Sequence, residues 1–278
     1  MKRVLSIQDI SCLGKGSLTV ALPIISAMGV ETSIVPTAVL STHTMFDNFT
    51  FRDLTEDMDG IKNHWVKEGF EFDAIYTGYL GSKEQVNIVN DFFHTFKNDH
   101  NYIIVDPAMA DNGKMYTGFS DDFALEMTRL CSTADIILPN ISEACFMLGK
   151  EYIGEDANLC KIKNLLIELT SLGAKTVVIT GVKFGEKKFG FMGYDTKSEE
   201  FFQYATEEIP MKSHGTGDVF ASTFTGALMN NYSVYNALKI AADFTCACIR
   251  NTYNDPNAVN YAVNFETEIP YLLKLIGK

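Results

Sequence analysis

Tyr102-Ile103-Ile104-Val105-Asp106-Pro107 is a short apolar run followed at once by an acidic turn, and this stretch decides the fold class. A continuous run of β-branched and aromatic residues, without polar alternation, predicts a strand that is buried on both faces of a parallel sheet. Further runs along the chain share this character. They are Val4–Ile7, Thr32–Val39, Ala74–Thr77, Ile136–Leu138 and Thr176–Thr180.

Helical patterns lie between these runs. The clearest is an apolar stripe that ends near Gly173, and it predicts an amphipathic helix. Its members are Ile162, Leu165, Leu166, Leu169 and Leu172. The alternation of buried strands and helices predicts an α/β protein with a central, mostly parallel sheet flanked by helices.

The pattern changes after Thr180. Phe189–Tyr194 and Phe201–Tyr204 read as two antiparallel strands rather than another crossover. Three helical segments follow: one that starts at 214–218 and runs through Leu228, one capped by Ser233, and Tyr271–Ile276 after Pro270. Because no repeat, charge block or linker divides the chain, we expect a single domain over residues 1–278.

Composition excludes several classes of protein. The chain has 278 residues, is 46% hydrophobic and carries a formal net charge of −12, so its surface repels nucleic acid and anionic membranes. The six cysteines form no CxxC pair and no zinc-type cluster. The apolar stretch around Val20–Val30 is far too short to cross a bilayer, and no secretory signal is present. We therefore expect a soluble cytoplasmic protein with buried free thiols.

The sharpest local motif is Gly215-Thr216-Gly217-Asp218 at a predicted loop-to-helix junction. Glycines allow the backbone to approach a ligand closely, and the first N–H groups of a helix form a site for an anion such as a phosphate. An aspartate in a first helical turn is also a common stabilising choice, because it interacts favourably with the helix dipole. The motif alone leaves both interpretations open.

Polar groups also follow two of the predicted strands. Asp106 and Asp111 come after Tyr102–Val105, while Asn140 and Glu143 come after Ile136–Leu138. Open α/β sheets bind ligands at the carboxyl ends of their strands, so these groups and the glycine motif are expected to meet in one crevice. Asn140 and Glu143 also fit a plain helix cap with its first-turn acid.

Taken together, these strings resemble the ribokinase-like small-molecule kinases, and within them the pyridoxal and pyridoxamine kinases. The resemblance runs in order over nearly the whole chain. The strings that narrow it are Leu5-Ser6-Ile7-Gln8, Ser41-Thr42-His43-Thr44, Thr77-Gly78-Tyr79-Leu80-Gly81-Ser82, and Asp106-Pro107 with Asp111 and Met115-Tyr116.

The resemblance implies a three-layer α/β fold and transfer of the ATP γ-phosphoryl group to the 5′-hydroxymethyl of a vitamin B6 vitamer. In such kinases catalysis is mostly positioning and charge neutralisation, with one base for the hydroxyl proton. By this analogy Asp218 is the base. The N–H groups of Gly215, Thr216 and Gly217 are expected to hold the migrating phosphoryl oxygens.

The resemblance also implies the remaining ligand contacts. The residues expected to hold Mg²⁺ through water are Asp111, Asn140 and Glu143. The residues expected to contact the nucleotide are Asp106, Tyr116, Thr180 and Thr216. Asp106 is also expected to lie near a monovalent cation such as K⁺. The residues expected at the vitamer are Asp9, His43, Thr44 and Tyr79. Similar kinases are homodimers, so we expect a homodimer that binds the vitamer and ATP and neither nucleic acid nor membrane.

Three departures from the family pattern stand out. Asp9 occupies a position where a serine is frequent, and Leu138 one where a threonine is frequent, while Gly14-Lys15-Gly16-Ser17 is shorter than the family stretch. A carboxylate accepts a hydrogen bond from a pyridinium N–H or a ring hydroxyl more strongly than a serine does. The preference among pyridoxal, pyridoxamine and pyridoxine and the monovalent cation site therefore stay open.

Other functions compete with this prediction. The nearest is the related kinase that phosphorylates hydroxymethylpyrimidine in thiamine synthesis, and a non-catalytic vitamer-binding protein is a more distant one. His43, Thr44 and Tyr79 argue against the pyrimidine kinase. A nicotinamide-dependent oxidoreductase would need GxGxxG after the first strand, and the residues after Ile7 lack it.

Overall fold

The computed structural model describes residues 1–154, 157–211 and 214–278. The chain forms two compact units, the first made of Met1–Tyr76 with Thr206–Lys278 and the second of Thr77–Ala205. The boundaries fall within strands β4 (Ala74–Thr77) and β11 (Glu200–Glu207), which explains why no linker composition marks them.

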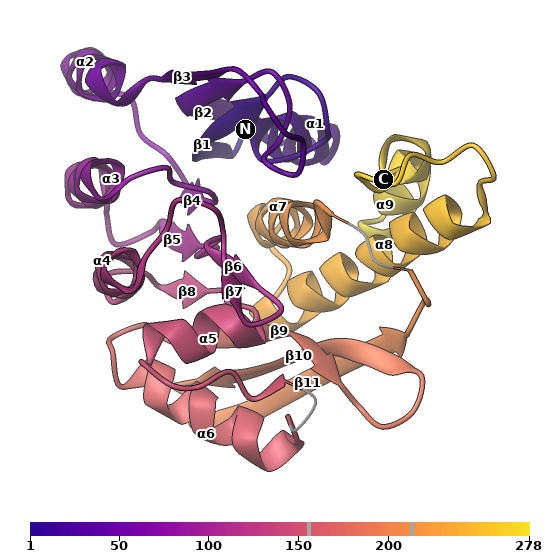
Figure 1. Ribbon diagram of the computed structural model, residues 1–278. Coiled ribbons are helices and arrows are strands. Elements are labelled where there is room, and N and C mark those ends of the chain that lie inside the picture. The colour runs from indigo at the N-terminus through magenta and orange to yellow at the C-terminus, as the bar shows by residue number, and fades with distance from the viewer. Residues whose placement is uncertain (155–156, 212–213) are drawn as a thin grey trace. The chain divides into compact units, whose positions relative to one another are not determined.

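The first unit contains strands in the order β4-β1-β2-β3. Strands β1 (Arg3–Ser11) and β2 (Glu31–Leu40) pair in parallel, and β3 (Phe51–Asp53) pairs antiparallel to β2 (Figure 1). The β1 side chains are buried almost throughout, as a strand covered on both faces requires.

Helices complete the first unit. They are α1 (Leu18–Ala27), α2 (Thr55–Glu68), α7 (Thr216–Met229), α8 (Val234–Asn254) and α9 (Ile269–Leu275), with a short 3₁₀ turn at Glu266–Glu268. Helix α7 packs between α1 and α8 and is buried along most of its length (Figure 1). Gly226 on α7 lies directly against Met28, so the absence of a side chain there permits this close approach.

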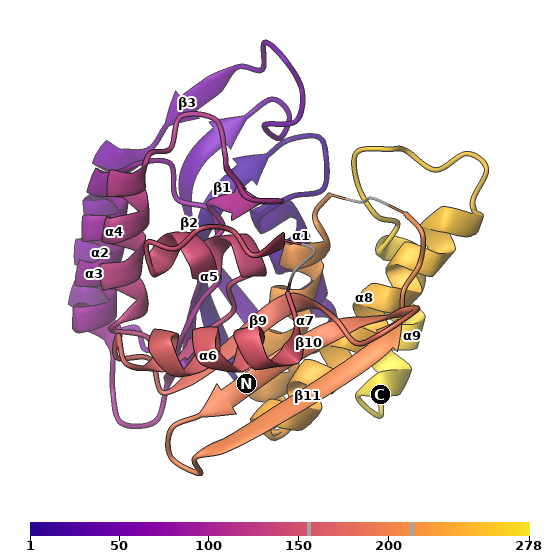
Figure 2. The same ribbon diagram turned by 60° about the horizontal axis from the view of Figure 1, so that its bottom comes forward.

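The second unit contains strands in the order β5-β8-β9-β10-β11. Strands β5 (Tyr102–Val105), β8 (Ile136–Ile137) and β9 (Thr176–Lys183) run parallel, whereas β10 (Lys188–Asp195) pairs antiparallel to β9. Figure 2 shows β9, β10 and β11 as long neighbouring ribbons.

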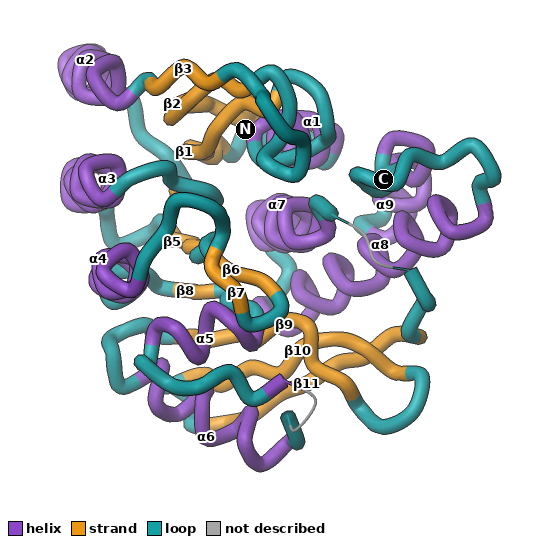
Figure 3. Tube along the Cα trace, in the orientation of Figure 1, coloured by secondary structure: helices purple, strands orange, loops and turns teal. Residues whose placement is uncertain are grey.

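Four helices belong to the second unit within its described ranges. They are α3 (Lys83–Phe96), α4 (Asp121–Cys131), α5 (Ile141–Met147) and α6 (Leu159–Thr170). Helix α6 covers β9 and β10 (Figure 2). A small hairpin of β6 (Ala110–Asp111) and β7 (Lys114–Met115) lies beside α5 (Figure 3).

The α/β class with mostly parallel strands and flanking helices is confirmed, as are the antiparallel strands after Thr180. Ser233 caps α8 as predicted, because its hydroxyl accepts from the Asn236 N–H. Several boundaries were wrong. Strands β1, β2 and β9 extend beyond the predicted runs. The last helix begins at Ile269 and includes Pro270, since proline lacks an N–H that a first turn does not need.

All six cysteines are free thiols, but Cys12 and Cys160 are exposed, so the expectation of buried thiols holds for the other four only. Among the described ranges, no helix combines the length and apolar character that a bilayer crossing needs.

Candidate active site

The glycine motif forms the turn that opens α7, as the sequence predicts. Gly215 precedes the helix with φ of +75°, a left-handed conformation that favours glycine. A Cβ on Gly215 would lie 2.7 Å from the Lys15 carbonyl oxygen. The Val219 N–H donates to the Gly215 carbonyl at 3.1 Å, so the N–H groups of residues 216–218 lie ahead of the first helical hydrogen bond. This is the geometry of an anion-binding helix terminus.

Asp218 lies in the first turn of α7 and is half-buried. One of its carboxylate oxygens, Oδ2, accepts the Ser17 N–H at 2.9 Å. Burial raises the pKa of Asp218 to about 6, and the negative charge of Asp9 contributes in the same direction. A carboxylate with a pKa near 6 is ionised at neutral pH and accepts a proton more readily than an ordinary aspartate.

Asp9 lies near the carboxyl end of β1 and is 3% exposed. Its Oδ2 accepts the Ser11 hydroxyl at 3.0 Å. Burial raises the pKa of Asp9, while the Ser17 and Ser11 side chains favour its charged form. The residue that departs from the family pattern is therefore a buried acceptor in the same cluster as Asp218.

His43 is fixed in one orientation beside this cluster. Its Nε2 donates to the Tyr261 carbonyl at 3.0 Å, and its Nδ1 accepts the Met45 N–H at 3.2 Å. Burial lowers the pKa of His43, which agrees with a neutral ring that donates at one nitrogen and accepts at the other. Thr44, the next residue, is exposed.

The His43 ring also has aromatic and backbone neighbours. The ring centroids of Phe46 and His214 lie 5.1 Å and 6.3 Å from it. Gly14 lies so close that an added Cβ would collide with the imidazole. The glycine loop after β1 therefore packs directly on the predicted vitamer residue.

In the second unit, Asn140 and Glu143 form a capping box at the start of α5. The Asn140 side chain accepts the Glu143 N–H at 3.0 Å, and Glu143 Oε2 accepts the Asn140 N–H at 2.8 Å. The Asn140 amide also donates to the Ala110 carbonyl at 2.7 Å, and Glu143 Oε1 accepts the Met109 N–H at 3.2 Å. The capping interpretation left open by the sequence is thus correct, and a ligand role would be additional to it.

Glu143 and Asp106 form a pair of buried acids, 2% and 8% exposed. Burial, together with the charge of Asp106, holds the pKa of Glu143 well above its ordinary value. The Asp106 N–H donates to the Thr77 carbonyl at 2.9 Å, which fixes the turn after β5. Two neighbouring buried carboxyl groups fit a bound cation, because hard oxygen donors are what Mg²⁺ prefers.

Asp111 is exposed, and its two oxygens accept from the backbone N–H and side chain of Asn112, both at 2.8 Å. In the part of the chain that the structure describes, no group of three or more His, Cys, Asp or Glu side chains is arranged to hold a metal ion. Binding of Mg²⁺ through water by Asp111, Asn140 and Glu143 stays a prediction.

The other predicted residues of the second unit have defined positions. Thr180 lies next to Asn140 in a parallel bridge, and its N–H donates to the Pro139 carbonyl at 2.9 Å. The Tyr116 N–H donates to the Met109 carbonyl at 2.8 Å. The Tyr79 ring stacks on Phe119 with centroids 5.4 Å apart.

The structure therefore assembles two clusters. In the first unit Asp9, His43 and residues 215–218 surround the loop 14–17. In the second unit Asp106, Asn140 and Glu143 follow the ends of β5 and β8, and Thr180 lies within β9 beside Asn140. The sequence did not predict Ser17 or His214 as site residues, although Ser17 belongs to the Gly14–Ser17 stretch that departs from the family pattern.

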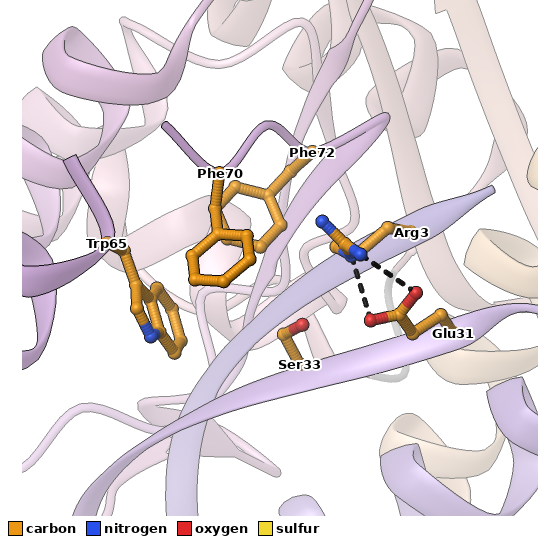
Figure 4. A pocket seen from close by; sticks show the side chains of 6 residues that line it. All are labelled: Arg3, Glu31, Ser33, Trp65, Phe70 and Phe72. Carbon is orange, nitrogen blue, oxygen red and sulfur yellow. Dashed lines mark hydrogen bonds and ion pairs between the residues drawn. The ribbon is translucent and has the colours of Figure 1, made fainter. Parts of the chain in front are cut away.

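A separate cavity in the first unit is lined by none of the residues that the sequence predicts for the active site (Figure 4). It has a volume of about 130 Å³ and lies at the amino-terminal ends of β1 and β2, where Arg3 pairs with Glu31 at 2.9 Å. Trp65, Phe70 and Phe72 form its aromatic wall. Because Asp9 lies toward the other end of β1, this cavity is not the predicted site.

Comparisons with known proteins agree on a class of enzyme. A curated hydroxymethylpyrimidine/phosphomethylpyrimidine kinase of Aquifex aeolicus is 28% identical over 191 residues, which cover 67% of this chain and 71% of that one. The crystal structure of a pyridoxal kinase from Lactobacillus plantarum matches with a TM-score of 0.90 and 27% identity, covering 99% of this chain and 98% of that one. The predicted ribokinase-like fold and the resemblance to pyridoxal kinases are thereby confirmed.

Another solved structure, with a higher sequence identity to this chain, combines the name of the pyrimidine kinase with bound pyridoxal. A candidate phosphomethylpyrimidine kinase from Bacteroides thetaiotaomicron, crystallised with pyridoxal, matches with a TM-score of 0.92 and 36% identity over 98% of this chain and 95% of that one. The sequence model of the phosphomethylpyrimidine kinase family matches residues 22–263. The chain therefore belongs to the phosphomethylpyrimidine kinase family.

Proposed function

We propose that this protein transfers the γ-phosphoryl group of ATP to the 5′-hydroxymethyl group of a vitamin B6 vitamer. The observation that carries the proposal is the position of Asp218 directly behind the Gly215 turn, held by the Ser17 N–H, with a pKa of about 6. A base and an anion-binding backbone within one helical turn are what phosphoryl transfer to an alcohol needs.

The reaction assigned to this turn is a direct displacement. The alcohol oxygen of the vitamer forms a bond to the γ-phosphorus while the bond from that phosphorus to the bridging oxygen breaks and ADP leaves. The hydroxyl proton passes to a carboxylate oxygen of Asp218. The N–H groups of Gly215, Thr216 and Gly217 stabilise the charge on the transferred group, because they lie at the positive end of α7.

The second-unit cluster is assigned to the nucleotide and its metal. Asn140, Glu143 and Asp111 would hold Mg²⁺ through water, and Asp106, Tyr116 and Thr180 would contact the nucleotide. Thr216, which belongs to the first unit, is also assigned to the nucleotide. Bound Mg²⁺ neutralises charge on the phosphates. The buried pair of Glu143 and Asp106 supports this assignment, since burial and the charge of Asp106 raise the pKa of Glu143 and a bound cation would offset both effects. The K⁺ ion, the homodimer and the cytoplasmic location stay predictions.

The vitamer ring is assigned to Asp9, His43, Thr44 and Tyr79. Asp9 is a buried acceptor suited to a pyridinium N–H or a ring hydroxyl. His43 is neutral and fixed by hydrogen bonds at both ring nitrogens, so it offers a flat surface of defined orientation. Tyr79 offers an aromatic face for stacking.

A second candidate is phosphorylation of hydroxymethylpyrimidine or its phosphate. The family match and the Aquifex aeolicus relative favour it. The pyridoxal kinase of Lactobacillus plantarum, in contrast, matches over nearly the full length of both chains, and the Bacteroides thetaiotaomicron structure contains pyridoxal. These two matches support the vitamer as the preferred substrate.

The substitution Asp218→Asn tests the assignment of the base. Asparagine keeps an oxygen that accepts the Ser17 N–H but does not accept the substrate proton. We expect kcat for pyridoxal phosphorylation to fall by at least ~10², while the dissociation constant for pyridoxal changes little. Steady-state kinetics with ATP and direct binding measurements check the two halves of this expectation.

A matched control is Asp57→Asn, an exposed acid in the first turn of α2. It carries the same change of charge at a helix N-terminus and is expected to leave kcat unchanged. Turnover by Asp218→Asn within a factor of about 3 of the unmodified protein would refute the base assignment.

A further inference from the structure

Three aromatic rings of the second unit form a continuous stack. Tyr79 follows β4, Phe119 lies in the loop between β7 and α4, and Phe123 lies in the first turn of α4. The rings of Phe119 and Phe123 are nearly parallel, with an angle of 5° between their planes and centroids 3.9 Å apart. The Tyr79 and Phe119 centroids are 5.4 Å apart at an angle of 28°. Phe119 therefore lies between a ring anchored in a helix and the ring assigned to the vitamer.

The two ends of this stack are held by their surroundings. Phe123 is 3% exposed on α4. Gly81, two residues after Tyr79, donates its N–H to Gln85 Oε1 at 2.7 Å in the first turn of α3. Phe119 is only half-buried, and the residues on either side of it are exposed. The contacts of its ring with the two neighbouring rings therefore contribute to fixing its position in the loop.

Backbone hydrogen bonds connect Phe119 to the cluster assigned to the nucleotide and its metal. The Phe119 N–H donates to the Tyr116 carbonyl at 3.1 Å, and the Tyr116 N–H donates to the Met109 carbonyl at 2.8 Å. The Met109 N–H donates in turn to Glu143 Oε1 at 3.2 Å. A continuous series of contacts thus leads from the carboxylate of Glu143 through the loop to the ring of Tyr79.

We propose that Phe119 is a positioning residue that couples binding of the vitamer to binding of the nucleotide. The proposal rests on the proposed function, in which Tyr79 contacts the vitamer ring while Tyr116 and Glu143 serve the nucleotide and its metal. A vitamer ring stacked on the opposite face of Tyr79 holds that ring against Phe119, and Phe119 holds the turn that begins at Tyr116. The ligand that binds first orders this loop, so the second ligand binds with a smaller loss of conformational entropy. The effect is reciprocal, because each ligand must strengthen the other by the same factor.

A purely structural role for Phe119 would have a different consequence. The ring would then only support the start of α4, and its loss would lower stability without changing how the two ligands affect each other. The start of α4 has other support, because the Ser120 carbonyl accepts the Phe123 N–H at 2.8 Å and Asp122 pairs with Lys83 at 3.0 Å. The coupling between the two ligands is therefore the readout that separates the two roles.

The test is isothermal titration calorimetry on the full-length protein. The Kd for pyridoxal is measured with Mg²⁺ alone and with Mg²⁺ plus a saturating ATP analogue whose β,γ-bridge is a methylene group, and the ratio of the two values is the coupling factor. Phe119→Leu keeps an apolar side chain for packing on α4 but removes the aromatic face, whereas Phe119→Tyr keeps that face. Tyr102→Leu is the matched control, because Tyr102 is 39% exposed at the start of β5, the opposite end of that strand from Asp106.

We expect the analogue to tighten pyridoxal binding by at least about fivefold in the unmodified, Phe119→Tyr and Tyr102→Leu proteins, and by less than about twofold in Phe119→Leu. Titration of the analogue with and without pyridoxal should return the same factor for each protein. Unfolding in denaturant, measured on all four proteins, verifies that each variant is folded at the temperature of the titration.

Three results would overturn the proposal: no coupling in the unmodified protein, full coupling in Phe119→Leu, or equal loss of coupling in Phe119→Leu and in either Phe119→Tyr or Tyr102→Leu. If Phe119→Leu does not fold, the comparison of Phe119→Tyr with the unmodified protein still decides, because a lost coupling there would contradict a role of the aromatic face. These titrations need no turnover. Failure of the proposed function would appear separately, as absence of pyridoxal phosphorylation by the unmodified protein.

Discussion

At the scale of single residues, the site depends on backbone conformations that most side chains avoid. Gly215 has φ of +75° and lies against the Lys15 carbonyl, and Ser17 in the same loop also has a positive φ. These conformations place the Asp218 carboxylate beside the Ser17 N–H and leave the start of α7 facing the 14–17 loop. The geometry of the proposed base is thus fixed by the backbone before any ligand binds.

Gly215→Ala tests this dependence. The added Cβ meets the Lys15 carbonyl oxygen, so either the 14–17 loop or the start of α7 must shift. We expect kcat to fall by ~10², since displacement of reacting groups by about 1 Å has effects of that size. Steady-state kinetics on purified protein measures the loss, and denaturant unfolding measures the accompanying cost of backbone strain.

Gly69→Ala is the matched control. Gly69 ends α2 with φ of +71°, and a Cβ there meets nothing within 4 Å. Both variants therefore carry the same left-handed strain of roughly 1–2 kcal/mol, and only Gly215→Ala carries the collision. Equal kcat values for the two variants would show that the close approach at Gly215 does not matter for turnover.

Single residues were predictable from sequence where they belong to a motif. The turn at 215–218 and the cap at Asn140 and Glu143 have spacings with a direct physical meaning, and the structure places both at helix starts. Ser17 was not predictable, because its importance comes from its φ and from its hydrogen bond to Asp218, which is distant in the sequence. Nothing in a lone serine reports either property.

At the scale of elements, one buried acid connects three strands and one helix of the second unit. Asp135 precedes β8, and its carboxylate oxygens accept from Lys97 and Lys175, both at 2.6 Å, and from the Ile103 N–H at 2.8 Å. Burial by itself raises the pKa of Asp135, but these hydrogen bonds outweigh it and hold the pKa below its ordinary value. Asp135 thus connects the end of α3 to the starts of β5, β8 and β9.

Asp135→Asn is expected to lower the free energy of unfolding by about 2 kcal/mol at pH 7, because two lysines lose a charged partner that is largely buried. The folded-state pKa is depressed, so the stabilisation is complete above the unfolded-state pKa of about 3.9 and is lost as the pH falls through the folded-state value. Denaturant unfolding of both proteins across pH 7 to 2 should therefore show the difference shrinking at acidic pH.

Asp122→Asn provides the comparison, since Asp122 pairs with Lys83 at 3.0 Å on the surface, where its side chain is 73% exposed. We expect this change to cost less than about 0.5 kcal/mol. A cost for Asp135→Asn no larger than that of Asp122→Asn, or one independent of pH, would refute the role of the buried acid.

Elements were predictable where burial imposes a period on the sequence. Strands β4 and β5 begin and end at the predicted residues, because each is a continuous apolar run bounded by polar residues. Strand β3 has exposed side chains only, and the β6–β7 hairpin has two residues in each strand, so neither leaves a hydrophobic pattern to find. Their existence follows from pairing with neighbours that a local pattern does not reveal.

At the scale of the whole molecule, the prediction of one domain stays untested, and the chain forms two compact units whose boundaries lie within strands. Composition could not reveal these boundaries, because a strand has the same apolar character on both sides of such a point. The proposed chemistry divides in the same way. The base and most vitamer residues belong to the first unit, and the metal residues and most nucleotide residues belong to the second. The family model matches residues 22–263, which include parts of both units.

The central claim is that the protein phosphorylates a vitamin B6 vitamer, and the most direct measurement compares substrates on the purified full-length chain with ATP and Mg²⁺. Initial rates with pyridoxal, pyridoxamine, pyridoxine and hydroxymethylpyrimidine give kcat/KM for each, and mass spectrometry identifies each product. We predict that at least one vitamer exceeds the pyrimidine by about tenfold or more in kcat/KM. A higher kcat/KM for the pyrimidine, or no phosphoryl transfer to any vitamer, would contradict the claim.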